Sequence, residues 1–207
     1  IGSELYSYFE KKENLKLYAT LKKKTEKKNI IEYDPTKNFE DIQILISNLK
    51  PDFIINTIGI TKHREEITNI KKTIFLNAIF PIRLSEICKK KKVKLIHFST
   101  DCVFSGKRGN YKETDLPDAV DIYGITKSLG EIKNNKYCLT LRTSFIGHQK
   151  NNKNGFFEWV LSNRNKKKIN GYKKAIYTGL TTLELTKLIY ELINKNIKIH
   201  GLYNVSS

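Results

Sequence analysis

Three side chains near the middle of the chain, Thr100, Tyr123 and Lys127, are of types that could together move a proton. Tyr123 and Lys127 lie four residues apart, so on a helix both would project from one face. A phenol with its usual pKa near ~10 is a slow proton partner at neutral pH, and a nearby ammonium lowers that pKa. The trio therefore predicts proton transfer to an oxygen atom that the Thr100 hydroxyl helps to orient.

The spacing alone is weak, because it recurs at Tyr8/Lys12, Tyr18/Lys22 and Tyr33/Lys37 in a chain rich in lysine. What distinguishes Tyr123 is the strand that precedes it. An apolar run from Leu95 to Phe98 stops at Ser99-Thr100-Asp101, as expected of a central parallel strand with polar side chains at its carboxyl end. Open α/β sheets place their sites at that end.

Four blocks follow one another in a fixed order: STDCVFSG (99–106), GNYKETD (109–115), YGITKSLGE (123–131) and RTSFIG (142–147). Together they resemble the extended short-chain dehydrogenase/reductase superfamily, and within it the dTDP-4-dehydrorhamnose reductase (RmlD-like, sugar-nucleotide-binding) family. The resemblance implies an α/β fold, a Rossmann doubly wound parallel sheet with a small, partly missing substrate lobe. Residues 1–147 would form the dinucleotide-binding domain, and residues 148–207 a partial substrate-binding lobe with elements that return to the core.

The resemblance also implies an activity, the NADPH-dependent reduction of a nucleotide-linked 4-keto-6-deoxy sugar, with NADH also usable. Such reductases serve nucleotide-sugar and cell-surface polysaccharide biosynthesis, including that of dTDP-rhamnose. Tyr123 would be the general acid, Lys127 would tune it and hold the nicotinamide ribose, and Thr100 would orient the carbonyl oxygen, with Ser99 as the fallback. One alternative is an epimerase or dehydratase of the same superfamily, although Cys102 stands where dehydratases carry a glutamate. The other is a non-catalytic, nucleotide-binding regulatory subunit.

The family pattern assigns further residues to the two ligands. Those expected at the cofactor are Gly2, Asn56, Thr57, Ile58, Gly59, Asn77, Ser99, Tyr123, Lys127 and Ser144. Those expected at the substrate are Thr100, Asp101, Cys102, Tyr123 and Phe145. Ile1-Gly2-Ser3 resembles the tail of a glycine-rich dinucleotide turn, so we expect a strand and the earlier glycines directly upstream, and about a quarter of a typical substrate domain is expected to be missing.

The charge of the chain, +17 over 207 residues, comes largely from lysine runs such as Lys22–Lys24 and Lys89–Lys92. These runs are not interleaved with aromatic residues that could stack on bases, so we interpret them as solvated surface and expect no nucleic-acid partner. The charge suits an anionic ligand, and Lys22–Lys24 at the end of a predicted strand favour the 2′-phosphate of NADPH.

The rest of the composition excludes several classes of protein. No run of eighteen apolar residues and no signal-peptide pattern is present, so we expect a cytoplasmic protein without membrane contact. Three cysteines match no disulfide or metal spacing, and the four histidines match no metal pattern, so no metal is expected. The sequence does not fix the oligomeric state; a homodimer is the partner arrangement considered.

Hydrophobic periodicity predicts the elements that must position these residues. Strands are expected at residues 15–21, 30–31, 53–55, 95–98, 137–141 and 202–205, and helices around residues 39–49 and 183–193. One helix, with Asn77 in it, should lead to the strand before Ser99 and end in Lys89–Lys92. A small apolar helix is expected near Gly155–Trp159, within an otherwise irregular segment.

Overall fold

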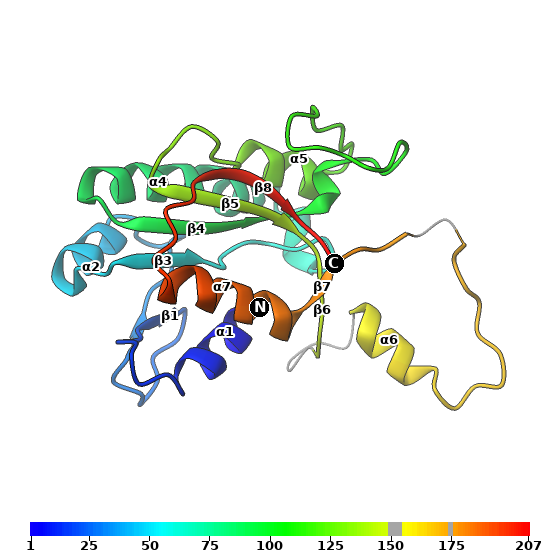
Figure 1. Cartoon of the computed structure of the whole chain (residues 1–207), viewed down its shortest axis with the longest axis horizontal. Coiled ribbons are helices and arrows are strands. Elements are labelled where there is room, and N and C mark those ends of the chain that lie inside the picture. The colour runs from blue at the N-terminus through cyan, green and yellow to red at the C-terminus, as the bar shows by residue number, and fades with distance from the viewer. Residues whose placement is uncertain (149–154, 174–175) are drawn as a thin grey trace.

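The computed structural model describes residues 1–148, 155–173 and 176–207, and its centre is a four-stranded parallel sheet (Figure 1). The strands are β3 (Phe53–Asn56), β4 (Lys94–Ser99), β5 (Cys138–Thr143) and β8 (Gly201–Val205), in the spatial order β3-β4-β5-β8. The predicted α/β class with a parallel sheet is confirmed. Because all four strands run the same way, their carboxyl ends share one edge, where Asn56 pairs with His97 and Ser99 pairs with Arg142.

Helices cover both faces of this sheet (Figure 1). On one face, α2 (Asp41–Leu49) and α4 (Phe80–Lys91) form a core cluster with Leu95. On the other face, α1 (Gly2–Phe9) and α7 (Thr182–Asn194) form a second cluster with Ile96 and Phe98. Successive residues of β4 thus enter opposite cores, which is why Leu95 and Ile96 are apolar neighbours and do not alternate with polar residues.

Two short parallel pairs lie outside the main sheet among the described residues. β1 (Ala19–Leu21) pairs with β2 (Ile30–Glu32), and β6 (Phe145–Ile146) pairs with β7 (Leu180–Thr181). The strand predicted over residues 15–21 is therefore too long; Leu15 and Leu17 pack against the second core cluster without belonging to a strand.

The segment predicted as one small lobe divides between two environments. Helix α6 (Phe156–Ser162) projects away from the sheet, whereas α7 packs on α1 and β8 joins β5 (Figure 1). The boundary between residues 147 and 148 stays a prediction. Residues 149–154 and 174–175 of the predicted irregular segment lie outside the described residues.

The helix predicted around Asn77 is interrupted. The chain passes through a 3₁₀ turn, η1 (Glu65–Thr68), the short helix α3 (Ile70–Ile74) and one wide π turn, η2 (Phe75–Ile79), before α4 begins. The π turn inserts an extra residue and leaves Asn77 fully buried. After β4, a second 3₁₀ turn, η3 (Asp101–Val103), and a long loop lead to α5 (Ile122–Leu129).

Candidate active site

Thr100 lies where β4 ends, and its hydroxyl has a fixed direction. It is the N-cap of η3: its Oγ1 accepts from the backbone N–H of Cys102 at 3.2 Å and donates to Asp101 Oδ1 at 3.1 Å. Only 5% of Thr100 is exposed. A cap of this kind holds the side chain at the carboxyl edge of the sheet, as the strand pattern predicts.

Tyr123 stands in the first turn of α5, which begins at the Asp121 cap; the Asp121 carboxylate accepts from the N–H of Gly124 at 2.9 Å. Gly124 lets this helix end touch η3 directly, since a Cβ there would come within 2.3 Å of the Cys102 carbonyl oxygen. The close approach brings Tyr123 beside Thr100, near enough for the Thr100 side chain to act on the pKa of the phenol. The structure therefore brings together two of the three residues singled out from the sequence.

Lys127, the third member, lies one turn further along α5 and is 6% exposed. Its Nζ donates to the carbonyl oxygen of Phe98 at 2.6 Å, at the end of β4. Burial lowers the pKa of Lys127 to about 8, and the Glu131 carboxylate partly opposes that shift. The ammonium is therefore held beside the strand end, where its charge is easily changed.

The pKa of Tyr123 differs from the expectation that Lys127 would lower it. Desolvation by burial raises that pKa to about 12, the Thr100 side chain acts in the lowering direction, and Asp101 raises it further. The cost of burying the phenolate away from water therefore has a larger effect on the Tyr123 pKa than the neighbouring side chains have. Tyr123 is thus protonated at neutral pH, which is the form that a proton donor must have.

Ser99 faces the opposite way from Thr100, because neighbouring side chains of a strand alternate. Its hydroxyl donates to Glu131 Oε1 at 2.8 Å, inside the helix layer. Thr100, rather than the fallback Ser99, is the hydroxyl beside Tyr123. The cofactor role predicted for Ser99 stays a prediction.

Residues predicted at the cofactor gather after β3, next to the end of β4. Gly2, at the start of α1, lies against Thr57, and a Cβ on Gly2 would come within 2.8 Å of Thr57 Oγ1. A cradle that only glycine can fill, at a helix N-terminus, fits the close backbone approach that a dinucleotide needs. Asn56 accepts from the N–H of Ile58 at 3.0 Å and donates to His97 Nδ1 at 3.1 Å, so its amide shapes the turn from within.

Asn77 and Gly59 form the wall of this turn. The Asn77 amide accepts from the N–H of Ile60 at 2.8 Å and donates to the Ile60 carbonyl at 3.0 Å and to Thr126 Oγ1 at 3.2 Å. A Cβ on Gly59 would approach Asn77 Oδ1 to 3.1 Å. Asn77 therefore joins the β3 turn to α5; its predicted cofactor contact stays a prediction.

Residues predicted at the substrate, and the predicted cofactor residue Ser144, surround the same edge. Ser144 Oγ donates to Asp101 Oδ2 at 2.9 Å, which links the ends of β4 and β5. Phe145 is 40% exposed beside them, and the pKa of the partly buried Cys102 thiol is raised by burial. Tyr177, which the sequence did not single out, lies beside Ser144; burial raises the pKa of its phenol, and the Ser144 side chain acts in the opposite direction.

The structure adds residues that sequence reasoning passed over although they stand inside the quoted blocks. Glu131 and Arg142, which end YGITKSLGE and begin RTSFIG, form a buried ion pair. In GNYKETD, Glu113 accepts from the backbone N–H of Asn204 at 2.8 Å, and the carbonyl of Tyr111 accepts from the Asn204 amide at 2.9 Å. The GNYKETD block thus connects its loop to β8. The only sequence signal for these residues was that they stand inside the ordered motifs.

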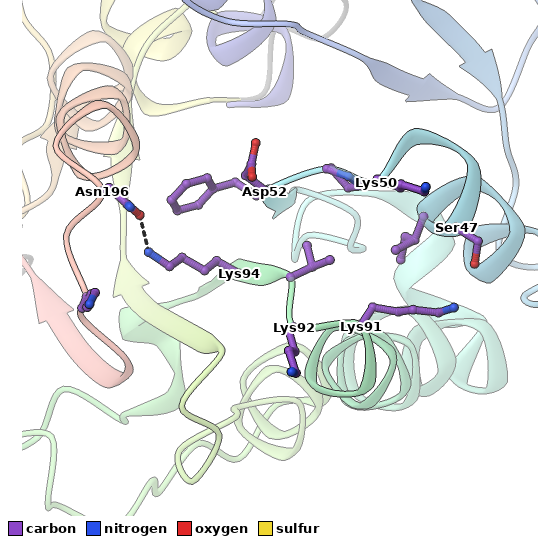
Figure 2. Close-up of a pocket in the computed structure, with 12 residues that line it drawn as sticks. Ser47, Lys50, Asp52, Lys91, Lys92, Lys94 and Asn196 are labelled. Atoms are coloured by element: carbon purple, nitrogen blue, oxygen red, sulfur yellow. Dashed lines mark hydrogen bonds between the residues drawn. The ribbon is translucent and has the colours of Figure 1, made fainter.

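A hollow of about 570 Å³ lies at the opposite, amino edge of the sheet, where β3 and β4 begin (Figure 2). Its lining combines apolar residues with one carboxylate, Asp52, and five lysines: Lys50, Lys91, Lys92, Lys94 and Lys198. Lys94 donates to Asn196 Oδ1, and no ion pair between described residues involves any of the five lysines. Six strand residues, about 20 Å, separate this hollow from Thr100.

Neither a metal-binding cluster nor a membrane-spanning helix is found among the described residues. Within residues 1–148, 155–173 and 176–207, no three histidine, cysteine or acidic side chains are grouped so that they could bind a metal ion. Over the same ranges, none of the helices has both the length and the apolar character needed to span a membrane.

A parallel sheet with a threonine, a tyrosine and a lysine at its carboxyl edge is the arrangement of the extended short-chain dehydrogenase/reductase class. The family model described as "RmlD substrate binding domain" matches residues 1–206. The chain therefore belongs to this family, in agreement with the resemblance read from its motifs.

Individual relatives are similar to this chain in sequence and in structure. A dTDP-4-dehydrorhamnose reductase of Aggregatibacter actinomycetemcomitans is 32% identical over 113 residues, which cover 52% of this chain and 38% of that protein. A hypothetical dTDP-4-dehydrorhamnose reductase of Sulfolobus tokodaii has a similar structure (TM-score 0.80, 25% identity, 100% of this chain, 72% of that one). So does a Bacillus anthracis str. Ames dTDP-4-dehydrorhamnose reductase solved in complex with NADP (TM-score 0.70, 24% identity, 86% and 66%). The matched part of this chain thus spans well under half the length of the Aggregatibacter actinomycetemcomitans reductase.

Proposed function

We propose that this chain is the catalytic part of an NADPH-dependent reductase that acts on a nucleotide-linked 4-keto-6-deoxy sugar. The observation that carries the proposal is that Tyr123 and Thr100 meet at the end of β4, where Gly124 of α5 packs against Cys102, with the Lys127 ammonium one helical turn away. The Bacillus anthracis relative's complex with NADP and the reductase names of the relatives support the choice of cofactor and substrate class. In this proposal the protein works in the cytoplasm, and a homodimer stays a prediction.

The residues of this chain would divide the work as follows. Bound NADPH supplies the hydride, and Gly2, Thr57 and Lys127 would hold it. Thr100 orients the ketone oxygen, and the protonated Tyr123 gives its proton to the oxygen as negative charge develops there. Exposed lysines at the end of β1, Lys22–Lys24, would favour NADPH over NADH.

Epimerase or dehydratase chemistry is the second candidate on this scaffold. Cys102 occupies the position of the glutamate expected in a dehydratase, and burial raises the pKa of its thiol, so it is a poor base. A non-catalytic nucleotide-binding subunit would not need Thr100 and Tyr123 to meet.

The test uses the full-length protein with NADPH and a panel of dTDP- and UDP-linked 4-keto-6-deoxy sugars. We expect oxidation of NADPH with at least one sugar, and a 6-deoxy sugar with a new hydroxyl at C4 as the product. Turnover of a sugar without net oxidation of NADPH would instead favour the epimerase. Binding of nucleotide without conversion of any sugar would favour the regulatory subunit.

A further inference from the structure

A buried ion pair lies directly under the proposed catalytic edge. Arg142 Nε donates to Glu131 Oε1 at 2.7 Å, and Arg142 Nη2 donates to Glu131 Oε2 at 2.8 Å. Glu131 Oε1 also accepts from the Ser99 hydroxyl at 2.8 Å. The two charged side chains are 0% and 1% exposed. One carboxylate thus fastens the end of β4 to β5 through a bidentate contact, the strongest geometry available to this pair.

We propose that Glu131 and Arg142 are positioning residues for the proposed reductase: they hold the end of β4 and the Lys127 ammonium in place, and Arg142 fixes the loop that follows β4. This inference rests on the function proposed above. The role is indirect, because neither residue is among those expected to contact the cofactor or the substrate.

The position of Glu131 is set by a contact that only glycine permits. Helix α5 ends at Leu129, and a Cβ on Gly130 would lie 2.0 Å from the carbonyl oxygen of Asn77. The chain therefore turns against η2 and brings the Glu131 carboxylate under β4, four residues after Lys127. The negative charge of Glu131 raises the pKa of Lys127 against the opposing effect of burial. Glu131 thus favours the charged form of the lysine as well as its location.

Arg142 extends the arrangement to the loop. Its guanidinium lies over the ring of Phe104 at 4.7 Å, and Phe104 stacks on Tyr111 with 4.2 Å between ring centroids and 7° between planes. The Tyr111 backbone is bonded to Asn204 of β8. The edge of the Arg142 guanidinium therefore binds Glu131, which holds the end of β4. Its face packs on Phe104 in the loop.

Stability alone is a poor explanation for this pair. Buried ion pairs are often no more stabilising than apolar residues of the same volume, because two charges must leave water. Here the cost is increased, since Arg142 Nη1 is buried without a hydrogen-bond partner among the described residues. We therefore infer that the pair serves to position the end of β4 and to favour the charged form of Lys127, and not to stabilise the fold.

Other charges near Lys127 are few. His97, on β4, is fully buried and its pKa is well below the usual value, so it is neutral at physiological pH. η2 has only uncharged side chains, and on α3 the exposed Lys71 lies beside Lys72, which pairs with Glu66. Lys94 stands at the far end of β4, and the remaining titratable groups on α5 and η3 are Tyr123, Asp101 and Cys102. Glu131 is the carboxylate that acts on Lys127.

The experiment compares Glu131→Gln with Glu131→Asp in the full-length protein. Glutamine keeps the shape and removes the charge, so the pKa of Lys127 should fall. We expect the alkaline limb of the kcat–pH profile to move to lower pH by about one unit, from a Lys127 pKa of about 8. Turnover at pH 7 should then fall about twofold, and turnover above pH ~8 should fall about tenfold. Aspartate keeps the charge but is too short for both bonds, so turnover should fall without a shift of the limb. The matched control is Glu191→Gln, which removes an exposed carboxylate paired with Lys195 on α7; it should change neither quantity.

A second measurement needs no substrate. The stability gained by Lys127→Met, measured by urea unfolding, should be larger in the Glu131→Gln background than in the parent, because the ammonium has lost its favourable neighbour. If Glu131→Gln does not fold, Glu131→Gln with Arg142→Met, which leaves no unpaired guanidinium, replaces it in both measurements. A folded Glu131→Gln variant with the parental pH profile and no coupling to Lys127 would overturn the inference. Failure of the parent to reduce any sugar, with the coupling present, would reject the proposed function and not the electrostatic effect of Glu131 on Lys127.

Discussion

The two edges of the central sheet carry cationic side chains in opposite ways. At the carboxyl edge, Lys127 and Arg142 are buried and each bonds an oxygen atom of the protein. At the amino edge, five lysines surround an open hollow and none pairs with a carboxylate among the described residues (Figure 2). Burial is what makes a charge sensitive to its neighbours, so we expect function to depend on the first group and very little on the second.

The largest effect should come from Tyr123→Phe. It removes only the proton donor, so turnover should fall by about 10² to 10⁴, the usual value of a positioned acid, with little change in cofactor affinity. Steady-state rates and NADPH titration of the full-length protein measure the two quantities. Parental turnover in a folded variant would remove Tyr123 from the catalytic role.

Lys127→Met should separate function from stability. Because the pKa of Lys127 is about 8 in the folded protein and near ~10.4 when unfolded, the folded state binds fewer protons between these pH values. Parental stability should therefore rise with pH across that window, and the burial cost is fully present below pH ~8. The variant should be more stable than the parent by roughly 2–3 kcal/mol at pH 7, less so at pH ~10, and inactive. Equal stability of both proteins at pH 7 would mean that the ammonium is not desolvated.

Replacing Lys22, Lys23 and Lys24 by serine tests a third, exposed group of cations at the end of β1. If they bind the 2′-phosphate, the affinity for NADPH should fall about tenfold more than that for NADH, and added salt should reduce the difference. An equal loss for both cofactors would identify the run as solvated surface. The triple variant Lys166→Ser, Lys167→Ser and Lys168→Ser changes the net charge by the same amount elsewhere and serves as the control.

The smallest effect is expected at the amino edge. Lys50→Ala with Lys91→Ala removes two ammonium groups from the lining of the hollow, about 20 Å from Thr100. We expect kcat/KM to change less than about twofold, because exposed charges at that distance are screened by salt. A tenfold loss would show that the two edges are not independent.

Residues 95–127 illustrate what the sequence could and could not predict. The apolar run that stops at Ser99-Thr100 and the spacing of Tyr123 and Lys127 predicted the strand end and the helix face, because both follow from local periodicity. The pKa of Tyr123 was predicted in the wrong direction, since burial depends on how α5 packs against η3 and no local pattern contains that information. The contact between Glu131 and Arg142 was missed for the same reason: the two residues meet only after β5 pairs with β4.

The π turn at η2 has a consequence for the length of the polypeptide. One residue more than an α-helix requires is accommodated between α3 and α4, and Asn77 lies within it. Deleting one residue there would let the turn close as a regular α-helix, with α3 and α4 in nearly the same phase but with the residues left in the turn facing new directions. Asn77 would then leave the Ile60 backbone and Thr126, and Gly130 would lose the carbonyl that it packs against. The segment should therefore tolerate many substitutions on its exposed face but no change in residue count.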